Sequence, residues 1–281
     1  MKTVCIFHED CMDGAAAAAV VRHKFRDVEL MPADHGEPVP PGLHGKKVFI
    51  VDFSFPAERL QEIKKAAAEL HWFDHHKTSI PIRDRLGYGI IEMEESGASL
   101  TWKQLFPNQE VPKIIQYVRD KDIWLWQLPD SREVSADMRE TEGIFNPTHA
   151  VWETWLAGVS TAEWQGMIER GRRSRRLQRD QMLKAAAKGF VIELDGSRAL
   201  AVNWTEDASD LGEYIYSELG YDVALTFHYN GRDWAFSLRS AKVDCSQIAL
   251  KRGGGGHRGA AGFRTPDIAW VFASQTGKIK G

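Results

Sequence analysis

Cysteine is scarce in this sequence. Cys5, Cys11 and Cys245 are odd in number and widely spaced, so neither a disulfide framework nor a cysteine-based zinc site is expected. No apolar run approaches the roughly 20 residues that a membrane-spanning helix needs, and residues 1–14 lack the pattern of a signal peptide. We therefore expect a soluble protein in a reducing cytoplasm, with no membrane partner.

A surplus of basic residues is also missing. The formal net charge is -3, whereas proteins that wrap long duplex nucleic acid usually carry an excess of Lys and Arg. This balance favours a small or short anionic ligand. Six arginines nevertheless crowd one stretch: Arg170, Arg172, Arg173, Arg175, Arg176 and Arg179. We interpret the stretch as a solvated linker helix; a docking face for RNA or a protein partner is the alternative.

The order of predicted elements divides the chain into two α/β parts. Apolar runs at 3–7, 47–51 and 69–73 alternate with helical patterns at 14–21, 56–70, 98–106 and 113–118, which predicts an open parallel sheet over residues 1–160. Residues 161–188 predict the linker helix. Residues 189–281 predict a smaller α/β domain with a hairpin turn at Asn230-Gly231, and the Pro/Gly-rich residues 32–45 predict a loop.

Acidic and histidine residues follow each of the three predicted strands. In chain order they are His8, Asp10 and Asp13, then Asp52, then Asp74, His75 and His76, with Asp120 and Asp122 after a later helix. Ligands of parallel sheets bind at the carboxyl ends of strands, and neighbouring strands lie about 5 Å apart. We therefore expect these side chains to converge.

Such a set of carboxylates would repel itself unless cations held it together. Mixed Asp and His ligands suit Mn²⁺, Fe²⁺, Co²⁺ or Zn²⁺, whereas Mg²⁺ prefers oxygen. Two such ions can bind a phosphoryl group and lower the pKa of a bridging water. Taken singly, Asp52 has an equally good explanation as a turn residue and His8 as a structural histidine. The ordered combination favours a metal centre.

A second candidate site is the glycine-rich segment near the C-terminus. Its residues Gly254, Gly255, Gly256, His257 and Arg258 combine bare backbone N–H groups, which approach anions closely, with two hydrogen-bond donors. Residues 260–262 are predicted to begin a helix whose N-terminus also favours anions. Arg239 and Ser240, after a predicted strand, are further candidate phosphate contacts. A flexible loop and a solvated strand end are the structural alternatives.

Taken in order, His8…Asp13-Gly14, Asp52, Asp74-His75-His76 and the distant GGGGHRGAAGF segment resemble the DHH/DHHA1 phosphoesterase superfamily over nearly the whole chain. The resemblance implies a metal-binding domain at 1–160, a substrate-binding domain at 189–281 and a cleft between them. It also implies two Mn²⁺ ions, with Mg²⁺ or Co²⁺ as alternatives.

The resemblance assigns roles as well. It implies metal ligation by His8, Asp13, Asp52, His75 and a downstream aspartate, for which Asp120, four residues before Trp124, is the first choice and Asp122 the second. Asp74 would bridge the metals or orient the histidines, and His76 would contact the scissile phosphate or support the ligands. His257 and its neighbouring glycines would hold substrate phosphate.

One position departs from the family's pattern. Members commonly have two aspartates separated by a single residue after the first histidine, whereas Asp10 and Asp13 are separated by two, with Cys11 at the expected position. Either Asp10 reaches the metal through a shifted loop, or Cys11 is a poor substitute for the expected aspartate.

We expect a phosphodiesterase that removes nucleotides from the 3′ end of short single-stranded RNA or DNA. One alternative is hydrolysis of a small phosphate compound, such as a cyclic dinucleotide, a nucleotide or a short polyphosphate. Another is a non-catalytic nucleotide sensor with an impaired first metal site. Tryptophans can serve as base-stacking platforms, although Trp152 and Trp155 are predicted to be core residues. A homodimer is one assembly we consider.

Overall fold

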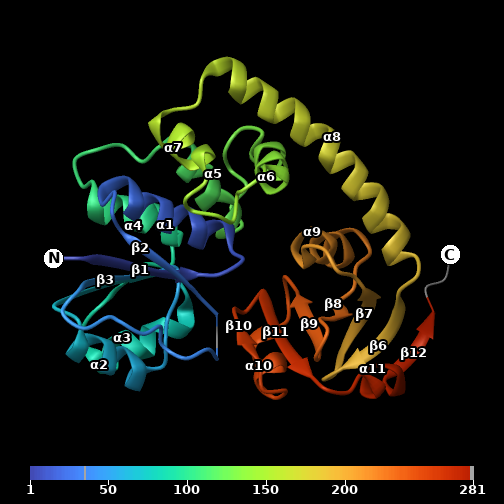
Figure 1. Cartoon of the computed structure of the whole chain (residues 1–281). Coiled ribbons are helices and arrows are strands. Elements are labelled where there is room, and N and C mark those ends of the chain that lie inside the picture. Colours follow the sequence, from blue (N-terminus) through green and yellow to red (C-terminus); the bar gives the residue numbers. More distant parts are fainter. Residues whose placement is uncertain (35, 279–281) are drawn as a thin grey trace. The chain divides into compact units, whose positions relative to one another are not determined.

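The computed structural model describes residues 1–34 and 36–278. The chain divides into two compact units, Met1–Arg175 (unit 1) and Arg176–Gly281 (unit 2), and the boundary falls inside helix α8, Thr161–Ala186 (Figure 1). No helix among the described residues is both long enough and apolar enough to cross a membrane.

Unit 1 is built on a five-stranded parallel sheet with the order β2-β1-β3-β4-β5. Its strands are β1 (Thr3–His8), β2 (Glu29–Ala33), β3 (Lys47–Val51), β4 (Glu69–Asp74) and β5 (Ile90–Ile91). The runs VCIF and VFIV are apolar on both strand faces, as strands covered on both sides by helices require.

Helices cover both faces of this sheet (Figure 1). They are α1 (Met12–Lys24), α2 (Ala57–Ala66), α3 (Ile80–Leu86), α4 (Gly97–Leu105), α5 (Lys113–Asp122), α6 (Ser131–Glu140) and α7 (Ala150–Ala157), with a 3₁₀ turn η1 at Lys77–Ser79. Alternate residues of β1 enter different cores: Cys5 and Phe7 pack with α1 and α4, whereas Val4 and Ile6 pack with α2. Five consecutive alanines of α1, residues 15–19, are all buried, and their small side chains let the helix lie close to its neighbours.

Unit 2 contains a seven-stranded mixed sheet with the order β10-β11-β9-β8-β7-β6-β12. Its strands are β6 (Phe190–Leu194), β7 (Ser197–Asn203), β8 (Val223–Tyr229), β9 (Trp234–Arg239), β10 (Gly255–Gly256), β11 (Ala260–Thr265) and β12 (Gln275–Lys278). Its helices are α9 (Ala208–Glu213), a π turn η2 (Tyr214–Glu218), α10 (Cys245–Leu250) and α11 (Ala269–Ala273). The pair β7–β8 is parallel and the other pairs are antiparallel.

The predicted fold class is confirmed: an N-terminal parallel α/β sheet is followed by a separate mixed α/β sheet. The turn at Asn230-Gly231 joins the antiparallel strands β8 and β9 as predicted, and Gly231 adopts a positive φ of 96°.

Several element boundaries were wrong. Residues 260–262 begin strand β11 instead of a helix, because Ala261 and Phe263 alternate into the core while the strand pairs with β9. The helix predicted over 56–70 ends at Ala66, since β4 already begins at Glu69. The loop predicted from residue 32 begins later, because Pro32 and Ala33 complete the edge strand β2. Asp120 and Asp122 lie inside α5.

The arginine-rich stretch lies on α8, and several of its side chains are in ion pairs. Arg170 pairs with Asp137 and Glu163, and Arg172 pairs with Asp130. Arg175 pairs with Glu133 and Arg179 with Glu218. The pairs of Arg172 and Arg179 are exposed on both sides, and exposed pairs contribute at most about 1 kcal/mol each.

We predict that the two glycines of α8 respond oppositely to alanine. A Cβ at Gly171 would lie 1.8 Å from the Glu133 carbonyl oxygen of α6, so Gly171→Ala should push the helices apart and lower the free energy of unfolding by about 1–3 kcal/mol. A Cβ at Gly166 would meet only the flexible end of Arg170, at 3.0 Å, so Gly166→Ala should be neutral or stabilise by up to about 1 kcal/mol. Urea unfolding measures both, and equal losses would contradict the close crossing.

Candidate metal centre

Three overlapping groups of side chains in unit 1 place potential metal ligands close together. Within each group the ligand atoms lie within 4.8 Å of one another: the first contains Asp52, Asp74, His75 and His76, the second His8, Cys11 and Asp52, and the third Asp13, His75 and Asp122. They come from the carboxyl ends of β1, β3 and β4, the start of α1 and the end of α5. The expected convergence at the strand ends is therefore what the structure shows.

Asp52 lies between two of these groups. It follows the last residue of β3 with a positive φ of 52°, a conformation that aspartate adopts more readily than most residues. Its backbone N–H still donates to the Phe73 carbonyl at 3.0 Å. Its buried carboxylate accepts from His75 Nε2 at 3.1 Å and from Cys11 Sγ at 3.4 Å, so Asp52 connects the first strand loop with the third.

Asp13 is held by the N-terminus of another helix. It lies in the first turn of α1 and is fully buried, and its carboxylate accepts the backbone N–H groups of Gly97 at 2.5 Å and Ala98 at 3.0 Å. The unpaired N–H groups at a helix start favour an anion. The start of α4 therefore compensates part of the charge of Asp13.

Gly97 is a functional position that the sequence analysis missed. A Cβ at Gly97 would lie 2.4 Å from the Asp52 Cβ and 2.9 Å from Asp13 Oδ2. Only glycine lets α4 begin against both carboxylates. The preceding Ser96 forms a capping box with Ser99, and this Ser-x-x-Ser spacing before a helix was the signal that marks the position.

His75 is surrounded by carboxylates. Its Nε2 lies 3.1 Å from Asp52 Oδ1, 3.3 Å from Asp122 Oδ2 and 3.8 Å from Asp13 Oδ2. Burial opposes protonation of His75, but the hydrogen bond to Asp52 and the charges of the three carboxylates outweigh it and raise the pKa of His75 to about 10. A cation is therefore strongly favoured at this point.

The pKa values of Asp52 and Asp13 are shifted in opposite directions. Burial acts first to raise the pKa of Asp52, but the hydrogen bond from His75 and the histidine charges bring it below its ordinary value. Burial and the charges of Asp52 and Asp122 raise the pKa of Asp13 well above its ordinary value. Among the described ion-pair partners, only histidines compensate these carboxylates.

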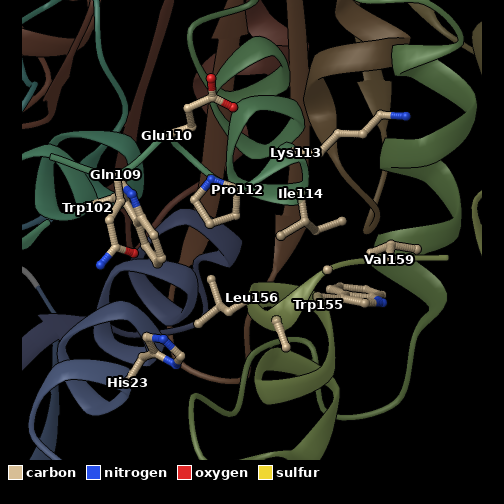
Figure 2. Close-up of a pocket in the computed structure, with 12 residues that line it drawn as sticks. His23, Trp102, Gln109, Glu110, Pro112, Lys113, Ile114, Trp155, Leu156 and Val159 are labelled. Atoms are coloured by element: carbon tan, nitrogen blue, oxygen red, sulfur yellow. The ribbon is translucent and has the colours of Figure 1, made fainter.

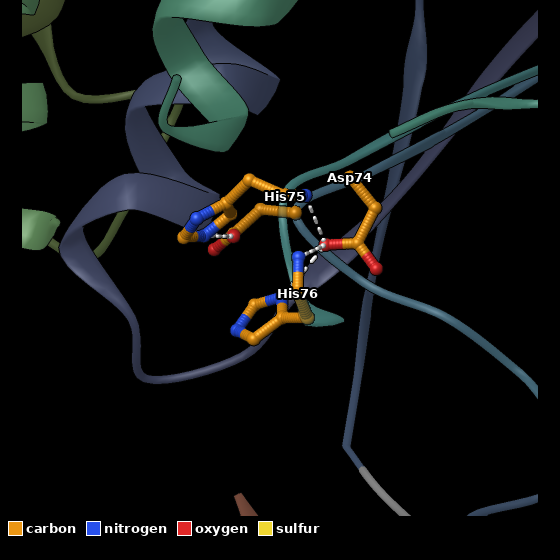
Figure 3. Close-up of side chains that lie close together, drawn as sticks. Asp74, His75 and His76 are labelled. Carbon is orange, nitrogen blue, oxygen red and sulfur yellow. Dashed lines mark hydrogen bonds and ion pairs between the residues drawn. The ribbon is translucent and has the colours of Figure 1, made fainter. Parts of the chain in front are cut away.

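Asp74 uses its carboxylate to organise its own loop. Oδ1 accepts hydrogen bonds from the backbone N–H of His75 at 2.8 Å and from Nδ1 of His76 at 2.6 Å (Figure 3). Oδ2 accepts from Ser79 Oγ at 2.5 Å. Burial would raise the pKa of Asp74, but these bonds and the charge of His76 hold it below its usual range. The geometry favours the orienting role for Asp74 over the bridging one.

Of the two downstream aspartates, Asp122 joins the cluster and Asp120 does not. Asp120 is buried, and its carboxylate accepts the backbone N–H groups of Gln127 at 3.0 Å and Leu128 at 3.3 Å. It therefore holds the loop after α5 in place.

In the loop after β1, Cys11 belongs to one of the three groups and Asp10 to none. Asp10 is exposed and has a φ of 51°.

The donor set fits divalent cations. Among the described residues, the ion-pair partners of Asp13, Asp52, Asp74 and Asp122 are all histidines, without a lysine or arginine. Buried carboxylates require compensation by a partner or a metal. Imidazole, carboxylate and thiol groups at this spacing are ligands of Mn²⁺, Fe²⁺, Co²⁺ and Zn²⁺.

The candidate phosphate ligands of unit 2 gather at one end of its sheet. Ala260 of β11 pairs with Arg239 of β9, and the Ser240 N–H donates to the Gly259 carbonyl at 3.1 Å. The turn closes through the His257 N–H, which donates to the Ala260 carbonyl at 2.7 Å. The Arg258 guanidinium donates to the Lys242 carbonyl at 3.4 Å. These candidate residues are therefore neighbours in the structure, and their contact with phosphate stays a prediction.

Close packing or hydrogen bonds within unit 2 explain the residue type at several of these positions. A Cβ at Gly254 would lie 2.0 Å from the Gly262 carbonyl, and one at Gly256, whose φ is 134°, would lie 2.6 Å from the Ala260 carbonyl, whereas Gly255 meets nothing within 4 Å. The Ser240 hydroxyl donates to the Asp222 carbonyl and accepts two backbone N–H groups. Arg239 donates to Ser209 Oγ at 3.2 Å.

A cavity of about 380 Å³ also lies in unit 1, next to α1, α4, α5 and α7 (Figure 2). Trp102, Trp155 and Leu156 line it with His23 and Lys113. None of the predicted site residues lines this cavity, and Trp155 is buried as expected of a core residue.

Comparison with known proteins places the fold. No family model matches the chain. An uncharacterized protein of Acanthamoeba polyphaga mimivirus is 27% identical over 287 residues, which cover 92% of this chain; the chain spans only 66% of that relative's length.

Two solved structures have the same fold at low sequence identity. The pGpG-specific phosphodiesterase PggH from Vibrio cholerae is 15% identical with a TM-score of 0.53, and the match covers 97% of this chain and 96% of that one. An exopolyphosphatase-related protein from Bacteroides fragilis is 16% identical with a TM-score of 0.55, covering 97% and 90%.

We predict that Asp120 and Asp122 separate stability from metal binding. Asp122→Asn should weaken Mn²⁺ binding at least about tenfold and leave thermal unfolding nearly unchanged. Asp120→Asn should leave one buried backbone N–H without its acceptor and cost about 1–3 kcal/mol, with Mn²⁺ binding retained. Calorimetric Mn²⁺ titration and thermal unfolding test the pair. Loss of Mn²⁺ binding in Asp120→Asn alone would overturn the assignment.

Proposed function

We propose that this chain, whose fold is that of the DHH-superfamily phosphoesterases, is a metal-dependent phosphodiesterase that removes nucleotides from the 3′ end of short oligonucleotides. The observation that carries the proposal is the cluster around Asp52 and His75, where four segments of the chain form three overlapping groups of carboxylates and imidazoles, and the ligand atoms within each group lie within 4.8 Å of one another. Buried carboxylates are costly unless they are compensated. Divalent cations would compensate them here and would also bind phosphate.

Two neighbouring positions would hold the metals. Asp13, His75 and Asp122 form one position, and His8 and Asp52 belong to the other. Bound there, divalent cations would neutralise charge on the phosphoryl oxygens and promote deprotonation of the attacking water.

We assign the contact with the phosphate to His76. Burial would lower the pKa of His76, but its hydrogen bond to Asp74 and the charge of that carboxylate raise it. Asp74 accepts at Nδ1, which directs the ring's other nitrogen, Nε2, away from Asp74. A protonated Nε2 would donate a hydrogen bond to a phosphoryl oxygen and stabilise the charge that develops there.

A pair of tryptophans next to Asp122 favours a substrate with bases. Trp124 and Trp126 both have positive φ values, 59° and 54°, which for bulky residues cost about 1–3 kcal/mol each and concentrate at functional sites. Their rings meet edge to face at 4.9 Å, and the Arg132 guanidinium lies 4.4 Å from the Trp126 ring centre. Both side chains are partly exposed.

Aromatic faces bind nucleobases without sequence preference. A base-free phosphate chain would gain little from such a pair. The tryptophans thus favour an oligonucleotide over the alternative of a short polyphosphate. The structural neighbour PggH, described as a pGpG-specific phosphodiesterase, is consistent with a short linear substrate.

The direct test is turnover of a 3′-labelled RNA trinucleotide by metal-stripped protein. We expect labelled mononucleotide to be released when Mn²⁺ is added back and not in EDTA. His75→Ala should abolish release while circular dichroism stays unchanged, because it removes a ligand of one metal position and the hydrogen-bond partner of Asp52 in the other. Substantial turnover in EDTA or in His75→Ala would refute the metal-dependent mechanism. Binding of the trinucleotide without turnover under Mn²⁺, Mg²⁺ and Co²⁺ would point to a nucleotide sensor.

We predict that Trp126→Ala raises KM for a dinucleotide by about 5- to 150-fold, which corresponds to the 1–3 kcal/mol of one base–aromatic contact. Trp126→Phe keeps an aromatic face and should stay close to the unsubstituted protein. Neither change should alter hydrolysis of base-free tripolyphosphate, if any is detected. An equal loss on both substrates would mean that Trp126 supports the loop instead of the base.

A further inference from the structure

Cys11 occupies a position where its residue type is unusual. It is the N-cap of α1, with extended backbone angles (φ -113°, ψ 130°), and its carbonyl accepts the Ala15 N–H at 2.9 Å. Ser, Thr, Asp and Asn are preferred there because their oxygens accept a backbone N–H. The Cys11 side chain makes no such capping bond. Helix capping therefore does not explain the cysteine at this position.

The sulfur faces the carboxylate at the centre of the site. Cys11 Sγ lies 3.4 Å from Asp52 Oδ2, and a ring nitrogen of His8 completes a group whose ligand atoms lie within 4.8 Å of one another. The approach is fixed by the backbone, because a Cβ at Gly14 would lie 2.4 Å from the His8 carbonyl. The turn from β1 into α1 thus holds His8 and Cys11 on the same side of Asp52.

The thiol already has a polar partner at this point. Cys11 Sγ donates to Asp52 Oδ2 at 3.4 Å. A divalent cation in the group would take the sulfur as a ligand, because metal coordination deprotonates a thiol.

We propose that Cys11 is a metal ligand that, with His8 and Asp52, forms a sulfur–nitrogen–oxygen position selective for a thiophilic cation such as Co²⁺, Fe²⁺ or Zn²⁺. Binding forms a metal–sulfur bond and releases the thiol proton to solvent. The neighbouring position of Asp13, His75 and Asp122 has no sulfur and keeps the preference of carboxylate and imidazole ligands. The two halves of the centre therefore differ in ligand softness. This inference rests on the proposed metal centre.

Cys11 therefore changes which metals are preferred by the position of His8, Cys11 and Asp52, and this position still binds a metal. Soft thiolate ligands select against Mg²⁺, which binds oxygen almost exclusively. We therefore expect Zn²⁺ and Co²⁺ to compete effectively with Mg²⁺ at this position. The two other cysteines, Cys5 and Cys245, are fully buried and belong to none of the three groups.

Co²⁺ titration of the metal-stripped full chain tests the proposal by absorption spectroscopy. We expect a thiolate-to-Co²⁺ charge-transfer band in the near ultraviolet that saturates with one Co²⁺ per chain. Cys11→Ser should lose this band and still bind Co²⁺, and Cys245→Ser, the matched control, should keep it. Cys11→Asp should restore an oxygen ligand and lower the preference for Zn²⁺ over Mg²⁺ at least about tenfold.

The outcomes separate this inference from the proposed function. Co²⁺ binding without a charge-transfer band in the unsubstituted protein would overturn the role of Cys11 and leave the metal centre intact. No Co²⁺ binding at all would overturn both. The band of the unsubstituted protein does not depend on a variant's folding, and Cys5 and Cys245 belong to none of the three groups, so its absence at saturating Co²⁺ is enough to overturn the proposal.

Discussion

Buried negative charge at the ends of parallel strands is the constraint on which unit 1 depends. Asp13, Asp52 and Asp74 are each at most 1% exposed, and a buried carboxylate without partners is costly. Each is compensated differently: Asp13 by the backbone N–H groups of α4, Asp52 by His75, and Asp74 by its own loop and Ser79. The loops are therefore ordered around the carboxylates.

This compensation determines several residues that have no chemical role of their own. Gly97 is required because α4 must begin against two carboxylates, and the alanines of α1 let that helix pack closely enough to deliver Cys11 and Asp13. Even so, only histidines are ion-pair partners of these carboxylates among the described residues, and His75 lies within 3.8 Å of three of them. This shortage of cationic partners is the physical reason to expect metal ions there.

The parts of the structure that follow from strong local patterns were predictable from the sequence. The apolar runs before His8, Asp52 and Asp74 specify buried strands, and parallel pairing brings their ends together. The choice between Asp120 and Asp122 was not predictable. Side chains two positions apart on a helix point about 200° apart, and the sequence does not indicate which of the two faces the sheet. Asp10 has a positive φ and is exposed, and no hydrophobic period in the sequence predicts this conformation either.

Unit 2 shows a different limit. Residues 260–262 are small and carry no hydrophobic period of their own, so the helix prediction failed where pairing with β9 decided the outcome. The glycines of the same segment were read as anion contacts, whereas Gly254 and Gly256 are also demanded by close backbone packing. The strained backbone of Trp124 and Trp126 is likewise a tertiary feature, imposed by the loop that Asp120 fastens.

The central claim is that unit 1 holds two divalent cations whose positions are joined by Asp52, which belongs to one position and accepts from His75 of the other. The most direct measurement is the number of Mn²⁺ ions retained by the metal-stripped full chain after equilibrium dialysis, compared with the Asp52→Asn variant. The account predicts two ions per chain, falling to one or none in the variant, because Asp52 lies between the two positions. A single ion in the unsubstituted chain, or two ions retained by Asp52→Asn, would contradict it.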